Sequence, residues 1–282
     1  MFSFNAGRLP DFLIIGAQKA GTTWLRALLR QHPDVYMPSR EIHFFNNERN
    51  YRRGVDWYKR RFLLAGSATH VGEKTPGYMW TNADAISTDL PNSHRRVAEV
   101  LPDAKFIAII RNPVDRAISA YNHHLTRGRI PPHLSMERLL FGDHKDLCRR
   151  HGLLSTGIYE QQLRDYLEVF DRDQLLVLTF EEDVVEDPER GIQKTCSFLD
   201  LAPNFAPDAP SKARHVHSFS KARTYLNYWL PIPFALTWPV DLVSTPWKRS
   251  APPAVRDRLR DFYGPHNERL YTLLGRRIEQ WG

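Results

Sequence analysis

Cysteine is scarce in this sequence, with only Cys148 and Cys196 among 282 residues. Two cysteines cannot form a disulfide framework, and these two do not have the spacing of zinc ligands. They fit a reducing compartment, so we expect a cytoplasmic protein. Long apolar runs are also missing, since the longest uncharged stretch, residues 224–240, is interrupted by three prolines. A spanning helix needs about 20 consecutive apolar residues, and residues 1–10 lack the apolar core of a secretory signal. We therefore expect no transmembrane segment.

The charge balance is moderately basic, with 39 Lys and Arg against 32 Asp and Glu and a net charge of +7. This bias suggests an anionic partner, such as phosphate, sulfate, nucleic acid or an acidic surface. The hydrophobic fraction of 42% supports a substantial core and excludes a disordered or collagen-like chain. The length suits one large domain or two small ones.

The apolar pattern indicates alternating strands and helices. Three uninterrupted apolar runs predict β-strands: residues 12–15, 105–110 and 174–180. None shows the polar alternation of a half-exposed sheet, which favours a parallel sheet covered on both faces. Helical spacing occurs in four segments: residues 24–30, 115–125, 157–170 and 188–199. The sequence thus predicts an α/β fold, with an open parallel sheet flanked by helices, in a single domain over residues 1–282.

Residues 202–253 differ from the rest of the chain because they are rich in proline and aromatic residues. We interpret them as an irregular cover segment. One interpretation of its aromatic side chains is a lid that binds either an acceptor or a membrane surface. The other, which we favour, is a hydrophobic cover on the sheet. The aromatic residues concerned are Tyr225, Tyr228, Trp229, Phe234, Trp238 and Trp247. Helical patterning returns over residues 254–281, with a turn predicted at Gly264 and Pro265.

A glycine-bearing turn, residues 16–21, lies between the first predicted strand and the first predicted helix. In this context backbone N–H groups and the helix dipole hold a phosphate. Lys19 adds a positive charge, and Thr22 and Thr23 add hydroxyl donors. The turn departs from the nucleotide triphosphatase loop, because its lysine precedes Gly21 instead of following it. The alternative is a plain glycine turn with an exposed lysine.

A second anion site is predicted at Arg111, directly after the second strand. Open α/β sheets bind ligands at the carboxyl ends of their strands, and the planar guanidinium suits a bidentate phosphate contact. Ser119 follows two turns into the next helix. The alternative is a structural arginine that pairs with Asp115. Two anion sites on separate turns indicate a ligand with two separated phosphate groups.

Residues 18–25, Gln-Lys-Ala-Gly-Thr-Thr-Trp-Leu, together with Arg111-Asn112-Pro113 and Ser119-Ala120-Tyr121, resemble the sulfotransferases that use 3′-phosphoadenosine 5′-phosphosulfate (PAPS). Residues 39–45, Ser-Arg-Glu-Ile-His-Phe-Phe, and 72–78, Gly-Glu-Lys-Thr-Pro-Gly-Tyr, are similar to segments of the heparan sulfate-type members. Residues 262–276 are similar to bacterial members. The resemblance runs from about residue 11 to residue 281 and is weakest over residues 202–253. It implies a P-loop-like fold.

The resemblance implies in-line transfer of a sulfuryl group from PAPS to an acceptor hydroxyl or amine, which releases phosphoadenosine phosphate (PAP). No metal is expected, because this donor has no triphosphate chain. The first motif is expected to hold the 5′-phosphosulfate, with Lys19 on the bridging oxygen: Lys19, Ala20, Gly21, Thr22, Thr23 and Trp24. Arg111 and Ser119 are expected to hold the 3′-phosphate. Tyr159 either helps to position the donor or packs in the core.

Glu41 is the expected general base, because a carboxylate can take the proton of the acceptor as attack proceeds. It occupies the position of the catalytic glutamate in the motif, and its alternative role is a surface ion pair with Arg40 or a lysine. His43 is the other candidate base, or else a core histidine beside two phenylalanines. Lys74 is the second candidate for a catalytic lysine, on the acceptor side, and its alternative is a solvated lysine in a turn before Pro76.

Family members usually close the donor site with a basic loop late in the chain. Two basic pairs are candidates here: Lys212 with Arg214, and Lys221 with Arg223. Two other functions stay open at this stage, a small-molecule kinase with an altered phosphate loop and a non-catalytic module that binds polyanions. A nucleic-acid partner is not expected, because no nucleic-acid motif is present. The acceptor class is open among glycan, lipid, peptide tyrosine and small natural product, peripheral membrane contact is possible, and the oligomeric state is not predicted.

Overall fold

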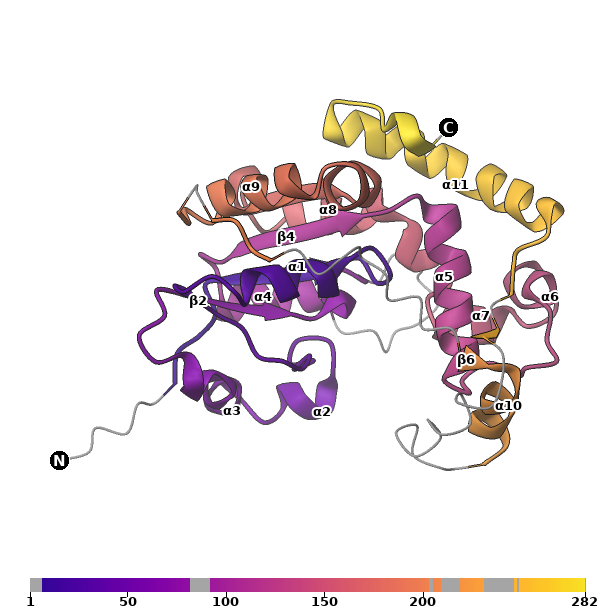
Figure 1. The fold of residues 1–282 in the computed structure, drawn as a ribbon, viewed down its shortest axis with the longest axis horizontal. Coiled ribbons are helices and arrows are strands. Elements are labelled where there is room, and N and C mark those ends of the chain that lie inside the picture. The colour runs from indigo at the N-terminus through magenta and orange to yellow at the C-terminus, as the bar shows by residue number, and fades with distance from the viewer. Residues whose placement is uncertain are drawn as a thin grey trace. The chain divides into compact units, whose positions relative to one another are not determined.

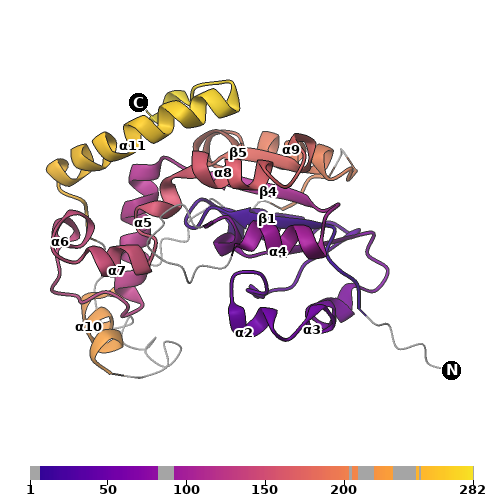
Figure 2. The ribbon, with the colours of Figure 1, turned by 180° about the vertical axis from the view of Figure 1, so that it is seen from behind.

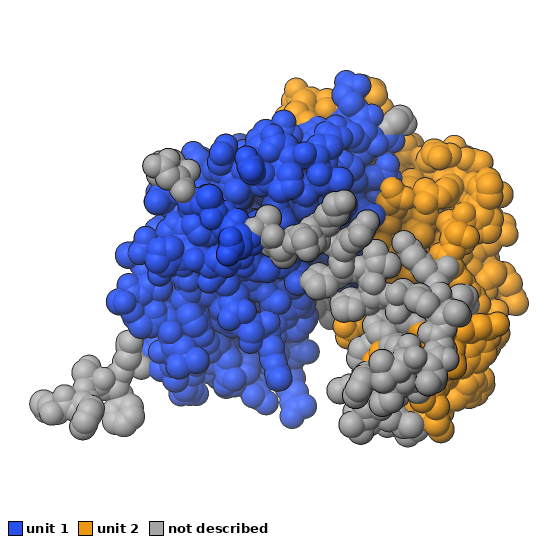
Figure 3. Space-filling model, viewed as in Figure 1, with its two compact units in different colours: residues 1–112, 159–213, 278–282 blue, residues 113–158, 214–277 orange. Residues whose placement is uncertain are grey.

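We describe the protein from a computed structural model. The structure describes residues 7–81, 92–202, 205–208, 219–230, 246–247 and 249–281. The chain forms two compact units (Figure 3): residues 1–112, 159–213 and 278–282 make unit 1, and residues 113–158 and 214–277 make unit 2. The single domain expected over residues 1–282 stays a prediction.

Unit 1 is built on a five-stranded parallel sheet in the order β2-β3-β1-β4-β5. Its strands are β1 (Phe12–Gly16), β2 (Val35–Tyr36), β3 (His70–Lys74), β4 (Lys105–Ile110) and β5 (Leu175–Thr179). All of β1 is buried, and so is β4 after Lys105. The Phe12 ring of β1 lies over Gly72 of β3, where an added Cβ would come within 2.2 Å of the ring, so only glycine fits there. The three predicted strands are confirmed as β1, β4 and β5, and the open parallel α/β sheet is confirmed with them.

Helices cover both faces of the sheet, as expected for buried parallel strands. Figures 1 and 2 show α1 (Thr22–Leu29) and α9 (Pro188–Phe198) on one face, with α4 (Ser93–Val100) and α8 (Tyr159–Leu167) on the other. The same arrangement follows from right-handed connections between parallel strands. Short elements complete the unit: α2 (Glu48–Tyr51), α3 (Val55–Lys59), η1 (Arg60–Ala65), η2 (Pro76–Tyr78), η4 (Arg172–Gln174), η5 (Phe180–Glu186) and η8 (Glu279–Trp281).

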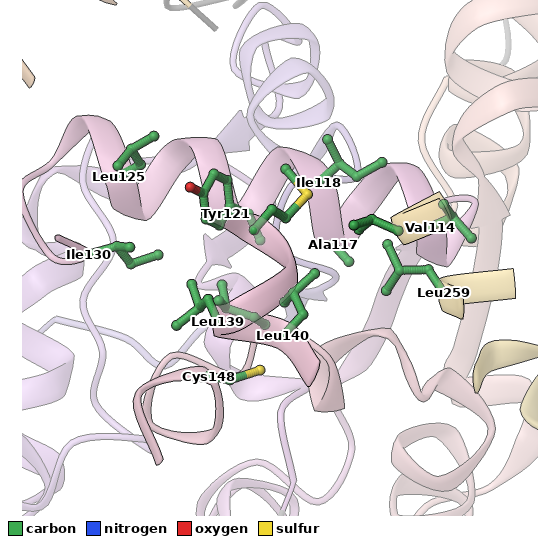
Figure 4. Close-up of a cluster of buried hydrophobic side chains, with 14 of the residues drawn as sticks. Val114, Ala117, Ile118, Tyr121, Leu125, Ile130, Leu139, Leu140, Cys148 and Leu259 are labelled. Atoms are coloured by element: carbon green, nitrogen blue, oxygen red, sulfur yellow. The ribbon is translucent and has the colours of Figure 1, made fainter. Parts of the chain in front are cut away.

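Unit 2 is mainly helical and packs around α5 (Pro113–Thr126). Its other elements are α6 (Met136–Phe141), α7 (Lys145–Arg150), η3 (Ser155–Gly157), α10 (Lys221–Trp229), α11 (Pro253–Leu274) and the short pair β6 (Phe219–Ser220) and β7 (Pro246–Trp247). Figure 4 shows Ala117 and Tyr121 of α5 in one buried cluster with Leu140 of α6 and Leu259 of α11.

Two sequence expectations are wrong in unit 2. The turn predicted at Gly264 and Pro265 does not form, because α11 continues through Pro265 to Leu274. Buried residues at helical spacing, such as Leu259 and Tyr263, hold this helix in place, and their packing outweighs the proline. Residues 202–253 are not wholly irregular either, because helix α10 lies among them. The Ser220 side chain caps this helix by accepting a hydrogen bond from the Arg223 N–H.

Candidate donor and acceptor site

The predicted phosphate turn leads from β1 into α1. Lys19 and Gly21 both have positive φ angles, 72° and 95°, which reverse the chain between strand and helix. A Cβ on Gly21 would meet the Phe180 ring at 3.0 Å, so the position favours glycine. No side chain caps the first turn of α1, and no acidic residue lies in it. Its N–H groups and dipole therefore favour an anion.

Arg111 is tied to this turn. Its Nη1 donates to the Lys19 carbonyl oxygen at 3.1 Å, and its guanidinium lies 4.7 Å from the centre of the Phe180 ring. The Nε of Arg111 is buried and has no hydrogen-bond partner within the described part of the chain. Asp115, the alternative partner, pairs with Arg256 at 3.0 Å. The structure therefore brings Arg111 to the turn that carries Lys19.

Tyr159 supports Arg111. The Tyr159 side chain is buried, and its hydroxyl donates to the Arg111 carbonyl oxygen at 2.8 Å. Trp281 packs near its ring, with the centroids 6.0 Å apart. Tyr159 is thus a packed core residue that is hydrogen-bonded to the backbone of Arg111, and its part in positioning the donor stays a prediction.

The predicted acceptor-side residues also converge. Lys74 is almost fully buried at the end of β3, and its Nζ lies 2.5 Å from Glu41 Oε1 and 3.3 Å from Thr23 Oγ1. His43 Nε2 lies 3.2 Å from Glu41 Oε2, and its Nδ1 lies 3.2 Å from Asn46 Oδ1. Lys74 thus links Glu41 to the first turn of α1, which follows the predicted phosphate turn. The ion pair considered as the alternative role of Glu41 is present, and its partner is a lysine, Lys74. His43, with 45% of its side chain exposed, is not a core histidine.

The electrostatics of this group follow from its contacts. Burial alone would raise the pKa of Glu41, but hydrogen bonds from His43 and Lys74 and the charge of Lys74 lower this pKa to about 2. The hydrogen bond to Glu41 raises the pKa of His43. Burial lowers the pKa of Lys74, against the attraction of Glu41. Glu41 is therefore ionised at neutral pH and able to accept a proton.

A buried carboxylate anchors the loop that carries Glu41 and His43. Glu73 accepts hydrogen bonds from Thr75 Oγ1 at 2.7 Å and from the hydroxyls of Tyr78, at 2.8 Å, and Tyr58. It also has a hydrogen bond to the backbone of Ile42. Sequence reasoning did not assign a role to Glu73, although it lies within the quoted residues 72–78. A charged residue in a strand whose neighbours are buried is the signal that points to it.

The remaining predicted residues are only partly placed. Ala20, Thr22 and Trp24 are buried, whereas Thr23 is exposed. Ser119 is half-buried on α5 in unit 2, and its approach to the donor stays a prediction. Lys221 is exposed and Arg223 buried on α10, while Lys212, Arg214, Phe234 and Trp238 lie outside the described residues. Which basic pair closes the donor site therefore stays open.

Residues 9–225 match the family model of the sulfotransferase domain. The chain belongs to the sulfotransferase family. It is 31% identical to human heparan sulfate glucosamine 3-O-sulfotransferase 6 over 284 residues, which cover 98% of this chain and 74% of the relative. It is 27% identical to human heparan sulfate glucosamine 3-O-sulfotransferase 5 over 276 residues, covering 96% and 74%. A crystal structure of a sulfotransferase from Alicyclobacillus acidocaldarius superimposes with a TM-score of 0.72 and 28% identity, covering 97% of this chain and 99% of that one.

This membership confirms the predicted enzyme class. The sulfotransferase moves a sulfuryl group, and PAPS is the donor that the family implies. The kinase and the non-catalytic polyanion-binding module are therefore rejected as descriptions of the chain. In the described ranges, no helix is long and apolar enough to cross a membrane.

Proposed function

We propose that this sulfotransferase transfers the sulfuryl group of PAPS to a hydroxyl of a glycan, with Glu41 as the general base. The observation that supports this most directly is the contact of Lys74 with both Glu41 and Thr23. It joins the base on the acceptor side to the turn on the donor side. The glycan is suggested by the two relatives, which are named for a glucosamine of heparan sulfate.

The donor turn fits an anionic ligand. The N-terminus of α1 has no side-chain cap, and the buried Nε of Arg111 has no partner among the described residues, so both suit a negatively charged group. In the proposal, Lys19 and the first turn of α1 hold the 5′-phosphosulfate, and Arg111 holds the 3′-phosphate. When bound, PAPS supplies the sulfuryl group and a stabilised leaving phosphate.

Lys74 connects donor binding to the strength of the base. With its present partners Glu41 has a pKa of about 2 and is a weak base. If Lys74 turns toward the transferring group when PAPS binds, Glu41 loses a cationic partner and its pKa rises. The base then strengthens while the lysine neutralises charge on the sulfuryl group. His43 keeps Glu41 oriented through its 3.2 Å contact.

Replacement of Glu41 by glutamine tests the base. We expect Glu41→Gln to bind PAP with unchanged affinity in calorimetry and to lose at least about a hundredfold in turnover, as general-base catalysis contributes roughly 10²–10⁴-fold. Arg111→Ala is the donor-side counterpart and is expected to weaken PAP binding. The matched control is Arg40→Gln at the exposed neighbouring position, which is expected to leave both properties intact. Full turnover in Glu41→Gln would exclude Glu41 as the base.

Acceptor class is tested with labelled PAPS and four acceptors: an N-sulfated glucosamine oligosaccharide, a lipid alcohol, a tyrosine peptide and a phenolic small molecule. We expect label only in the oligosaccharide. Label in another acceptor would replace the glycan assignment and leave the base assignment untouched. We also propose a cytoplasmic location, which rests on the scarcity of cysteine in the sequence.

A further inference from the structure

One exposed face of unit 1 combines strong positive charge with exposed leucines. It comprises residues 48–65 of α2, α3 and η1, and we name it the Arg–Leu face. Its exposed basic residues are Arg49, Arg52, Arg53, Arg60 and Arg61. Glu48, one of its two acidic residues, is already paired with Arg52 at 2.8 Å and with Arg96 at 2.5 Å. Figures 1 and 2 show α2 and α3 next to each other on the outside of unit 1.

The local fold explains why leucines lie on this face. The backbone of η1 is kinked at Phe62, which separates Arg60 and Arg61 from Leu63 and Leu64. Phe62 and Ala65 are buried, and they fix the segment to the body of unit 1. Leu63 and Leu64, between them, are exposed by 45% and 83%. Arg60 and Arg61, before the kink, are exposed as well. This short segment therefore exposes two arginines and two leucines.

The Arg–Leu face is firmly supported from below. Tyr58 stacks on Phe44 with ring centroids 4.5 Å apart and contacts Phe62 edge-on at 5.2 Å. Above this aromatic layer, the guanidiniums of Arg53 and Arg61 lie 5.1 and 4.4 Å from the centre of the Trp57 ring. Two of the five exposed arginines are therefore held against one indole ring.

We propose that the Arg–Leu face docks on a lipid bilayer that contains anionic phospholipids. Arginines are attracted to anionic headgroups, and adjacent leucines gain by entering the acyl boundary. Stable attachment to a bilayer needs two such signals, and this face supplies both. An acidic polysaccharide would satisfy the arginines but offers no apolar phase for Leu63 and Leu64. Charge complementarity and leucine exposure together favour the bilayer.

The Arg–Leu face is also joined to the candidate acceptor site. Asn50 of α2 donates from Nδ2 to the carbonyl oxygens of Ile42, at 3.1 Å, and His43, at 3.2 Å. Phe44, in the same loop, packs against Tyr51 and Tyr58. A bilayer bound to this face would hold the Glu41 loop near the lipid surface. This consequence rests on the proposed function, whereas the docking itself does not.

Vesicle sedimentation of the full chain tests the proposal. We expect the protein to bind phosphatidylcholine vesicles that contain phosphatidylglycerol and not to bind vesicles of phosphatidylcholine alone. Added salt is expected to weaken the binding to the anionic vesicles. Leu63→Ser with Leu64→Ser, and separately Arg60→Gln with Arg61→Gln, are each expected to reduce partitioning by about tenfold or more. The matched control is Arg149→Gln with Arg150→Gln, which removes two exposed charges from α7. It is expected to change partitioning by less than about twofold.

Two results would overturn the proposal. One is the absence of binding to anionic vesicles. The other is that the double arginine variant binds less to dextran sulfate, while the double leucine variant binds dextran sulfate and vesicles as the wild type does. This result would identify a surface that binds polyanions instead of bilayers. Sulfuryl transfer to a water-soluble acceptor is measured in parallel and is expected to be unchanged in every variant. If the wild type showed no sulfuryl transfer, this would contradict the proposed function and would not bear on the docking.

Discussion

Substitution of two buried tyrosines can distinguish the effect of positioning the Glu41 loop from the effect of packing in the core. Tyr58 and Tyr78 are both fully buried, and both donate their hydroxyl to Glu73. Only Tyr78 also accepts a hydrogen bond from the loop, from the Phe44 N–H at 2.8 Å. Tyr58→Phe therefore removes one donor to Glu73, whereas Tyr78→Phe also leaves the loop N–H without its acceptor.

The magnitudes follow from these contacts. A buried polar group left without its partner costs about 1–3 kcal/mol. We expect Tyr58→Phe to lower the free energy of unfolding by about that amount, and Tyr78→Phe to lower it by roughly 2–5 kcal/mol because two partners are lost. Since a displacement of about 1 Å at a reacting group can cost about a hundredfold in rate, we expect kcat to fall about 10- to 100-fold in Tyr78→Phe. We expect less than about a twofold fall in Tyr58→Phe, which keeps the bond to the loop.

The assay combines urea unfolding, PAP calorimetry and steady-state sulfuryl transfer. PAP affinity is expected to stay at the wild-type value in both variants, because neither tyrosine touches the donor turn. The decisive readout is kcat at a temperature where both variants are fully folded. Equal kcat values for the two variants would refute the positioning role and leave Glu73 as a purely structural residue.

Two further predictions concern pH. Glu41 has a folded pKa of about 2 against an ordinary 4.5, so its charge stabilises the fold above pH 4.5, and this stabilisation is lost as pH falls toward 2. Because a third of the side chain is exposed, screening by solvent limits the stabilisation to about 1–2 kcal/mol. Urea unfolding should therefore show a difference in stability between wild type and Glu41→Gln at pH 6 but not near pH 2. His124 has both ring nitrogens buried without a hydrogen-bond partner among the described residues, and burial with the nearby charges of His151, His123, Arg129 and Arg116 lowers its pKa to about 2. Stability should therefore fall by about 1.4 kcal/mol per pH unit below 6.5, and His124→Leu should remove this dependence in thermal unfolding between pH 6.5 and 5; an unchanged slope would contradict it.

The sequence predicted those parts of the sheet whose stability is local. β1, β4 and β5 are uninterrupted apolar runs, and burial on both faces is what such runs require. β3 escaped prediction because it carries Glu73 and Lys74, whose burial depends on partners from distant parts of the chain. Likewise, the helix through Pro265 depends on packing within unit 2, which a local breaker rule cannot anticipate.

For the site, the sequence supplied the residue types and the fold supplied the pairings. Nothing in the spacing of Glu41, Lys74 and Thr23 indicates that one lysine contacts both other side chains. The same holds for Arg111, whose bond to the Lys19 carbonyl depends on the adjacency of β1 and β4. Resemblance to a family placed these residues in roles, but the physical coupling between the roles is visible only in three dimensions.

Glu41 and Glu73 show how one site divides two tasks between carboxylates. For Glu41, cationic partners outweigh partial burial and lower its pKa. For Glu73, complete burial outweighs its hydrogen bonds from hydroxyl and backbone groups, and its pKa is raised. Environments that push two pKa values apart mark different functions. In the proposed mechanism the more accessible carboxylate, Glu41 beside Lys74, receives the acceptor proton, whereas the enclosed Glu73 holds the loop in place through its hydrogen bonds. Stronger cationic surroundings would weaken Glu41 as a base. The proposed mechanism therefore requires Lys74 to leave Glu41 when the donor binds.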